Sequence, residues 1–223
     1  MKSFALATLL LAGALPVHAN IVTFEVTTLV SEIREAVSHG APAVTPITPV
    51  TDTLLTPAKV SVGDKLVTRI SYDTAWYPDY VGSSGATYSS TALAAFPAAA
   101  LTFANGLQVM STSQHAHVDV YNDSYDALNL TASFSPLSAL SFRLYDASAN
   151  ALSSTALPTY LNASQFAFKE MNLFWNNANN DIAMIDGNIL SITQLSPVPE
   201  PASYSMLLAG MAVVGYALRR RQA

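Results

Sequence analysis

Residues 128–134, with the sequence LNLTASF, alternate between apolar side chains and small or polar ones. The stretches HVDVY at residues 117–121 and LSFRLY at residues 140–145 show the same period of two. This period is typical of a β-strand, because successive side chains of a strand point to opposite faces of its sheet. We therefore predict strands here that place one face on a hydrophobic core.

Further strands are predicted on both sides of these stretches. The apolar pattern indicates them at residues 21–33, 60–72, 107–121 (two strands or one bent strand), 128–134, 140–145, 166–175 and 182–195. Turn-forming pairs such as Gly63-Asp64 and Asn105-Gly106 stand between them. Many short strands without a long amphipathic helix predict an all-β fold, an antiparallel β-sandwich of the jelly-roll or Ig-like type.

Two stretches interrupt the pattern. Residues 39–57 carry four prolines among alanine, valine and threonine, which favours an extended Pro/Thr-rich insertion because proline donates no ladder hydrogen bond. Residues 91–101 are rich in alanine, and their pattern leaves a short helix and a buried strand open. We expect residues 20–197 to form one β-sandwich domain.

Composition limits the partners of this domain. The chain of 223 residues is 51% hydrophobic and 11% charged, below the charged share of about 25% in average soluble proteins. Residues 20–197 hold six basic and fourteen acidic side chains, a formal charge of −8. Such a domain repels nucleic acid, so no nucleic-acid partner is expected. The absence of cysteine excludes disulfides and thiolate chemistry.

The N-terminus predicts export. Lys2 precedes an apolar stretch at residues 4–15, and Val17-His18-Ala19 follows as a small-x-small cleavage site. This order is typical of a secretory signal peptide, here residues 1–19. The expected partners are the Sec translocon and signal peptidase.

The apolar character of the C-terminal residues predicts a membrane-spanning segment. Val198-Pro199-Glu200-Pro201 is followed by an apolar run at residues 203–218 and then by Arg219, Arg220 and Arg221. As a helix the run is about 24 Å long, which just spans a core of roughly 30 Å if the arginines extend to the interface. The arginines are the predicted cytoplasmic stop, which leaves the domain outside.

Residues 198–223 resemble a PEP-CTERM sorting tail, which is also labelled an ice-binding protein C-terminal domain. The resemblance implies recognition by an exosortase near Pro199-Glu200-Pro201 and membership of the surface proteins of bacteria that make an exopolysaccharide matrix. Both prolines keep Glu200 in an extended segment. The alternative is a plain membrane anchor that is never cut.

The first candidate site in the domain is a metal site. On a strand, His115, His117 and Asp119 share one face, and Val118 and Val120 share the other. Two histidines and a carboxylate suit zinc or iron. An exposed polar face opposite a core face explains the same pattern without metal.

The second candidate is a calcium site. Asp119, Asn122, Asp123 and Asp126 place oxygen ligands across a predicted hairpin turn. The spacing does not match an EF-hand, and turn chemistry explains the residues equally well. No other cofactor is expected.

The third candidate is a saccharide-binding platform. Tyr72, Trp76, Tyr77 and Tyr80 lie near one another in a predicted loop, where exposed rings could stack on sugar rings. A loop that packs its own aromatic side chains is the alternative.

Three classes of function follow from the sequence. The first is a non-catalytic cell-surface or matrix protein with a structural or adhesive role, anchored in the inner membrane by its tail before processing. The second is a carbohydrate-binding module that contacts extracellular polysaccharide. The third is a metal-dependent hydrolase that uses His115, His117 and Asp119. No nucleophile elbow or phosphate-binding loop occurs, so we do not expect an enzyme.

Overall fold

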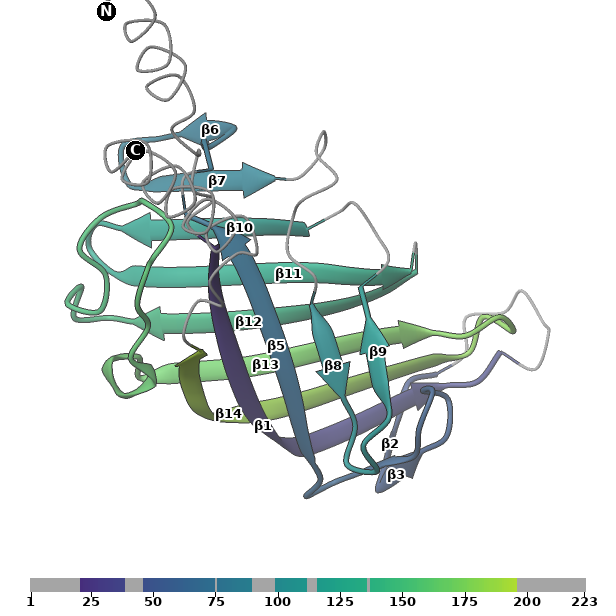
Figure 1. Ribbon diagram of the computed structural model, residues 1–223. Helices are drawn as coiled ribbons and strands as arrows, with labels where there is room; N and C mark the ends of the chain where they lie inside the picture. The colour runs from purple at the N-terminus through teal and green to yellow at the C-terminus, as the bar shows by residue number, and fades with distance from the viewer. Residues whose placement is uncertain are drawn as a thin grey trace, which may run out of the picture.

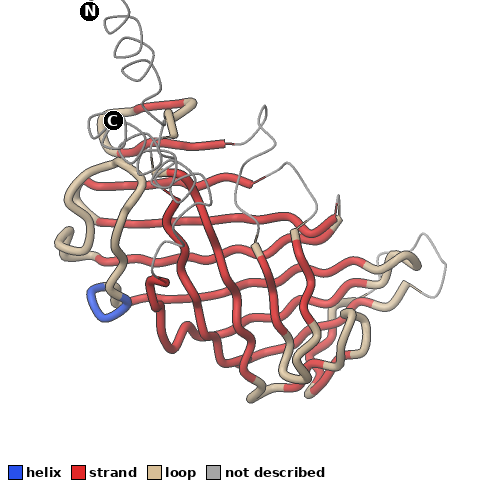
Figure 2. Tube along the Cα trace, viewed as in Figure 1, coloured by secondary structure: helices blue, strands red, loops and turns tan. Residues whose placement is uncertain are grey.

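The computed structural model describes residues 21–38, 46–74, 76–89, 99–111, 116–135 and 137–195. Within these ranges the regular secondary structure is β-strand, apart from one short 3-10 helix, Ala163–Gln165 (Figure 2). The strands are β1 Ile21–Ala36, β2 Thr48–Val50, β3 Asp52–Thr53, β4 Val60–Ser61, β5 Lys65–Asp73, β6 Tyr80–Val81, β7 Gly85–Ser89, β8 Ala100–Thr102, β9 Gln108–Met110, β10 Ala116–Asn122, β11 Asp126–Ser135, β12 Ser138–Asp146, β13 Phe168–Asn176 and β14 Ile182–Leu195.

The strands confirm the predicted antiparallel all-β class. Twelve of them form one sheet in the order β6-β7-β10-β11-β12-β13-β14-β1-β5-β8-β9, with β2 beside β1, and β3 pairs with β4. Every pairing is antiparallel. A jelly-roll or Ig-like sandwich is not confirmed, because the pairing connects these strands into one sheet instead of two.

The sheet curls over so that β1, β5 and β8 lie across the face of other strands of the same sheet. In Figure 1, β5 and the first half of β1 cross in front of β11 to β14, and β8 lies in front of β13. The pairing of β1 with β14 contains register shifts at Thr27/Thr28 and at Val30/Glu32. Such bulges bend a strand and increase its twist, so they explain how β1 turns from one layer of the curled sheet into the other.

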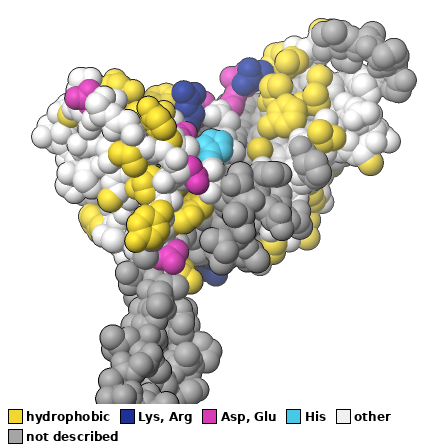
Figure 3. Space-filling view, turned by 90° about the horizontal axis from the view of Figure 1, so that it is seen from above, with side chains coloured by type: hydrophobic (Ala, Val, Ile, Leu, Met, Phe, Trp, Pro, Cys, Tyr) yellow, Lys and Arg dark blue, Asp and Glu magenta, His cyan; other side chains and the backbone are white. Residues whose placement is uncertain are grey.

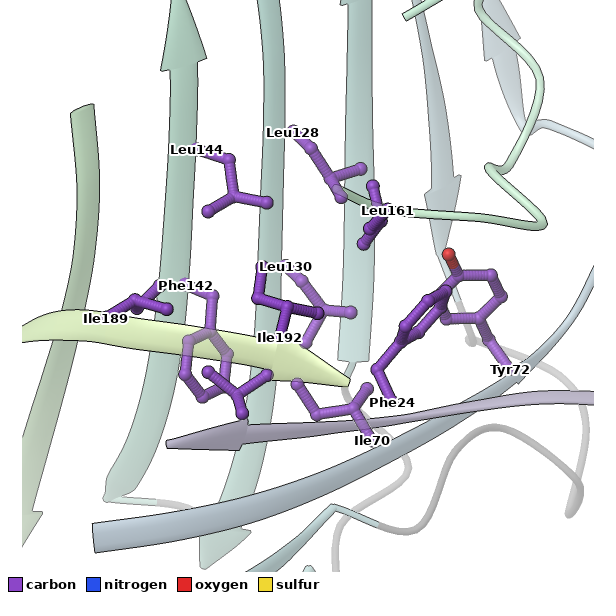
Figure 4. A pocket seen from close by; sticks show the side chains of 11 residues that line it. Phe24, Ile70, Tyr72, Leu128, Leu130, Phe142, Leu144, Leu161, Ile189 and Ile192 are labelled. Atoms are coloured by element: carbon purple, nitrogen blue, oxygen red, sulfur yellow. The ribbon is translucent and has the colours of Figure 1, made fainter. Parts of the chain in front are cut away.

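The core lies between these two layers. Phe24 of β1 and Ile70 of β5 point toward Leu130 of β11 and Phe142 of β12, and the same core holds Val118 of β10 (Figure 4). A small cavity of about 30 Å³ between the layers has a purely apolar lining surface. An apolar space of this size is a packing gap, because a bound water needs polar partners.

The structure describes part of each of the two interrupting stretches. Within residues 39–57, which the sequence predicts as an extended loop, β2 pairs with β1 through Arg34↔Pro49 and its neighbours. Pro49 is tolerated because β2 pairs on one side only. Of residues 91–101, the end is strand β8 with Leu101 fully buried.

Residues 147–162 form a strap that closes one end of the core. Leu157 and Leu161 of the strap and Phe166 just after it are buried in the core cluster. The hydroxyl of Tyr72 donates to the Pro158 carbonyl at 2.7 Å, and that of Tyr88 donates to the Thr155 carbonyl at 3.0 Å. The strap is therefore anchored to both layers of the curled sheet.

Candidate functional site

Aromatic side chains form a row across the outer face of the sheet. Strand register places Tyr121 of β10 opposite Ala127 of β11, Ala127 opposite Tyr145 of β12, and Tyr145 opposite Phe168 of β13. Tyr125, in the turn between β10 and β11, packs with ring centroids 6.1 Å from Tyr121 and 5.4 Å from Tyr145. We call Tyr121, Tyr125, Tyr145 and Phe168 the aromatic row.

Glycine at position 85 makes room for the first ring of this row. A Cβ atom on Gly85 would lie 2.8 Å from Cδ1 of Tyr121 and 3.1 Å from the Val120 carbonyl oxygen. Because Gly85 is the register partner of Tyr121 on β7, its missing side chain lets the ring lie against the neighbouring strand.

The aromatic row lines a surface groove of about 360 Å³ together with Asn129 and Arg143. Tyr125, Tyr145 and Phe168 keep 37%, 39% and 47% of their surface exposed. Most large apolar side chains of a sheet face its core, so three exposed rings in one groove mark a contact surface.

A polar row runs parallel to the aromatic row, two residues further along each strand. Register aligns Thr87, Asp119, Asn129, Arg143, Glu170 and Asn188 across β7, β10, β11, β12, β13 and β14. The Thr87 hydroxyl donates to Oδ1 of Asp119 at 2.7 Å, and the Asn172 amide donates to Oε1 of Glu170 at 2.7 Å. Both carboxylates of this polar row therefore have a partner within the protein.

The carboxylate of Asp119 also changes the pKa of one tyrosine of the aromatic row. Its carboxylate is the main cause that raises the pKa of Tyr121, followed by burial and by Tyr125. The phenol of Tyr121 therefore stays protonated at neutral pH and keeps its donor hydrogen.

A second polar row continues the outer face. It aligns His117, Thr131, Ser141, Asn172 and Asp186. The Asn172 amide donates to Oδ1 of Asp186 at 2.6 Å, and Arg34 forms an ion pair with the same carboxylate. Figure 3, a view from above, shows charged side chains and a histidine gathered in a hollow, beside a surface that is otherwise mostly uncharged.

The predicted metal residues are only partly described. His117 and Asp119 lie on the outer face, with Nε2 of His117 3.8 Å from Oδ2 of Asp119, whereas Val118 and Val120 are fully buried as the alternation predicts. His115 lies outside the described residues. Among the residues that are described, no three histidine, aspartate or glutamate side chains stand close enough to hold one metal ion.

The predicted calcium residues are divided between two places. Asp126 is fully buried, and its carboxylate accepts from the Asn122 amide at 3.1 Å and from the Leu152 N–H at 2.7 Å. Asp119 lies on the outer face with Thr87, and Asp123 is exposed in the turn. The structure thus gives Asp126 and Asn122 a role in holding the strap, and it does not gather the four residues around one point.

The predicted aromatic platform is not one surface. Tyr72 is 2% exposed and packs on Phe24 with ring centroids 5.7 Å apart, so it cannot stack on a ligand at the surface. Trp76 packs against the core beside Tyr88. Tyr77 and Tyr80 are exposed, at 85% and 66%. Tyr72 points inward because alternation along β5 places it on the same face as the buried Leu66 and Ile70.

Sequence reasoning did not find the aromatic row. Its members come from three strands and a turn between residues 121 and 168, and only cross-strand register brings them together. The sequence does carry one signal for it. In each strand the buried residues occupy every second position, and Tyr121, Tyr145 and Phe168 occupy the positions between them, which face outward.

Fold and site together define a curled antiparallel β-sheet protein with an aromatic and polar groove on its outer face. Residues 197–221 match the PEP-CTERM protein-sorting motif, so the chain carries a PEP-CTERM sorting domain. This motif indicates an exported protein that is sorted by an exosortase. No curated protein and no solved structure is significantly similar to the chain.

In the sequence, the sorting motif begins shortly after the last described strand. β14 ends at Leu195, and the matched segment begins at residue 197. Val198, Pro199, Glu200 and Pro201, the arginines at positions 219–221 and the expected signal peptide all lie outside the described residues. Within the described ranges, no helix has the length and apolar character needed to cross a membrane.

Proposed function

We propose that this chain is a non-catalytic protein of the cell surface or the exopolysaccharide matrix, with an adhesive role carried by the outer face of its sheet. The observation that carries the proposal is the sorting motif at residues 197–221. The exposed rings of the aromatic row give this face a contact surface.

In this proposal the two ends of the chain act in sequence. The signal peptide directs the chain to the Sec translocon, and the apolar tail holds it in the inner membrane with Arg219, Arg220 and Arg221 on the cytoplasmic side. Exosortase then acts near Pro199-Glu200-Pro201, close to the end of β14. The released domain reaches the cell surface or matrix.

The experiment that tests the sorting step compares C-terminal peptides by mass spectrometry. The chain is expressed in a host with its exosortase gene and in the same host without it, together with a variant in which Pro199, Glu200 and Pro201 are replaced by alanine. We expect loss of the apolar tail only for the unmodified chain in the complete host. Retention of the full tail in both hosts would identify a plain anchor and contradict the proposal.

Carbohydrate binding is the second candidate function that an observation favours. The groove combines exposed aromatic rings with the Asn129 amide and the Arg143 guanidinium. Rings supply flat apolar surface, and amide and guanidinium groups supply hydrogen bonds that fix the orientation of a polar ligand.

A further inference from the structure

The shape of the groove fits a chain of sugar rings. The rings of Tyr121, Tyr125 and Tyr145 follow one another with centroids 6.1 Å and 5.4 Å apart, and Phe168 extends the lining across β13. A pyranose ring has an apolar face of C–H groups that packs on an aromatic ring, while its hydroxyls project at the edges. A continuous row of rings therefore suits consecutive sugars of one chain.

Polar side chains line the same groove and are able to hydrogen-bond to sugar hydroxyls. Asn129 and Arg143 line the groove in the strand positions next to Ala127 and Tyr145. The amide of Asn129 both donates and accepts, which matches hydroxyls that do the same. The protonated phenol of Tyr121 adds a donor at the far end of the aromatic row.

The charge of the groove points to an acidic sugar. Among the described residues that line the groove, Arg143 is the one charged side chain. Within the described part of the chain, no carboxylate lies within ion-pair distance of its guanidinium. Glu170, its register partner on β13, accepts a hydrogen bond from Asn172, and Asp119, two strands away on β10, accepts one from Thr87. A guanidinium in a groove whose described lining has no carboxylate favours a ligand that brings its own carboxylate, which it holds by two parallel hydrogen bonds. The preference depends on this local contact, because the net charge of the domain repels anions at longer range.

We propose that this groove binds a polysaccharide that contains carboxylated sugars. The sugar rings pack on Tyr125, Tyr145 and Phe168, and Arg143 binds a sugar carboxylate. The proposal rests on the proposed adhesive function and names the ligand class of that same surface. It is independent of the sorting step, because binding by the purified protein requires no export.

The test measures binding of defined oligosaccharides to the purified full chain in detergent by isothermal titration calorimetry. The probes are a hexamer of galacturonic acid and a neutral hexamer of glucose. We expect the acidic hexamer to bind at least tenfold more tightly than the neutral one. The preference is expected to shrink as salt is raised, because the contact between Arg143 and the carboxylate is screened at an exposed site.

Two substitutions and two matched controls assign the binding to the groove. Tyr145→Ala is expected to weaken binding of the acidic hexamer at least tenfold, because the aromatic row loses the ring between Tyr125 and Phe168. Arg143→Gln is expected to abolish the preference for the acidic hexamer. Tyr160→Ala removes an exposed tyrosine of the strap, and Lys65→Gln removes an exposed basic side chain of β5; neither should change binding. Melting curves check that each variant is folded.

Three outcomes overturn the inference. They are no binding of either hexamer, binding that Tyr145→Ala leaves unchanged, and equal binding of the neutral hexamer that does not depend on Arg143. Any of these can occur while exosortase processing is intact, so failure of the ligand assignment is distinguishable from failure of the sorting step.

Discussion

Gly187 shows how one residue permits the bend of the sheet. A Cβ atom at this position would lie 2.5 Å from Cγ2 of Thr28, 2.9 Å from the Leu29 carbonyl oxygen and 3.2 Å from Cε of Met171. Gly187 pairs with Val30, next to the register shift where β1 turns. The β1 backbone can approach β14 this closely only because position 187 has no side chain.

We therefore predict that Gly187→Ala destabilises the domain by about 1–3 kcal/mol, the usual cost of forcing atoms into a packed site. Chemical denaturation monitored by circular dichroism measures this change. Gly82→Ala is the matched control, because its Cβ would meet only the ring of Tyr80, which is 66% exposed and can move. Equal stability of the two variants would contradict the role assigned to Gly187.

Asp146 is a single residue that is expected to make the stability of the fold depend on pH. The Ser148 hydroxyl, and then the N–H groups of Asn150 and Ser148, hold the pKa of Asp146 below its usual value. A carboxylate with a lowered pKa stabilises the folded state at pH values above its unfolded pKa, and this contribution is lost as pH falls through its folded pKa.

Asp146→Asn is accordingly expected to lower the melting temperature at pH 7 and to lower it less at pH 3, where part of the contribution of the wild-type carboxylate is already lost. Melting curves across this range are the measurement, with Asp123→Asn, an exposed turn aspartate, as control. A difference between Asp146→Asn and wild type that is independent of pH would show that the charged form of Asp146 is not what stabilises this turn.

At the scale of elements, the strap of residues 147–162 has the most specific anchors. It is held by the phenols of Tyr72 and Tyr88 and by the carboxylate of Asp126, which accepts from Leu152. Burial is the main cause that raises the pKa of both tyrosines. Both hydroxyls therefore stay protonated and keep donating at neutral and alkaline pH.

The double variant Tyr72→Phe/Tyr88→Phe is predicted to lose about 2 kcal/mol of stability, roughly 1 kcal/mol for each hydrogen bond. We also expect faster hydrogen exchange and proteolysis within residues 150–160, because the buried rings remain while the strap loses two anchors. Tyr77→Phe, at an 85% exposed tyrosine, should change neither quantity. Unchanged exchange in the double variant would show that apolar packing alone holds the strap.

At the scale of the whole molecule, the first and last described strands pair with each other. β1 and β14 are matched from Thr23↔Leu195 to Ala36↔Ile182. β1 also pairs with β5, so it joins the two layers between which the core lies. The core is therefore complete only when β14 is in place.

A chain that ends at residue 177, before β14, is predicted to lack a cooperative thermal transition, because Met171 and Leu173 of β13 and Val30 of β1 would lose their cover. A chain that ends at residue 196 removes only the sorting tail and should melt cooperatively. Circular dichroism and hydrogen exchange compare the two. Cooperative melting of the shorter chain would mean that β1 to β13 form a stable unit without β14.

Much of the fold could be predicted from local pattern. The seven predicted strand regions all contain strands, and Gly63 and Gly106 adopt the positive φ of the predicted turns. At the site, the outward position of His117 and Asp119 was predicted, whereas one member of the candidate aromatic platform, Tyr72, is buried. Tyr72 is the last residue of the predicted strand at residues 60–72, and it is buried because it shares a face of β5 with Leu66 and Ile70.

The sequence by itself determined which residues form strands, which face of each strand is apolar, and which tail carries the sorting motif. These properties depend on neighbouring residues, since a period of two and a Pro-Glu-Pro segment are local. Only the tertiary structure decided that one sheet curls over its own core and that Tyr121, Tyr125, Tyr145 and Phe168 meet in one groove. Register and strand order depend on contacts between distant segments, and the bend depends on bulges and on the space left at Gly187.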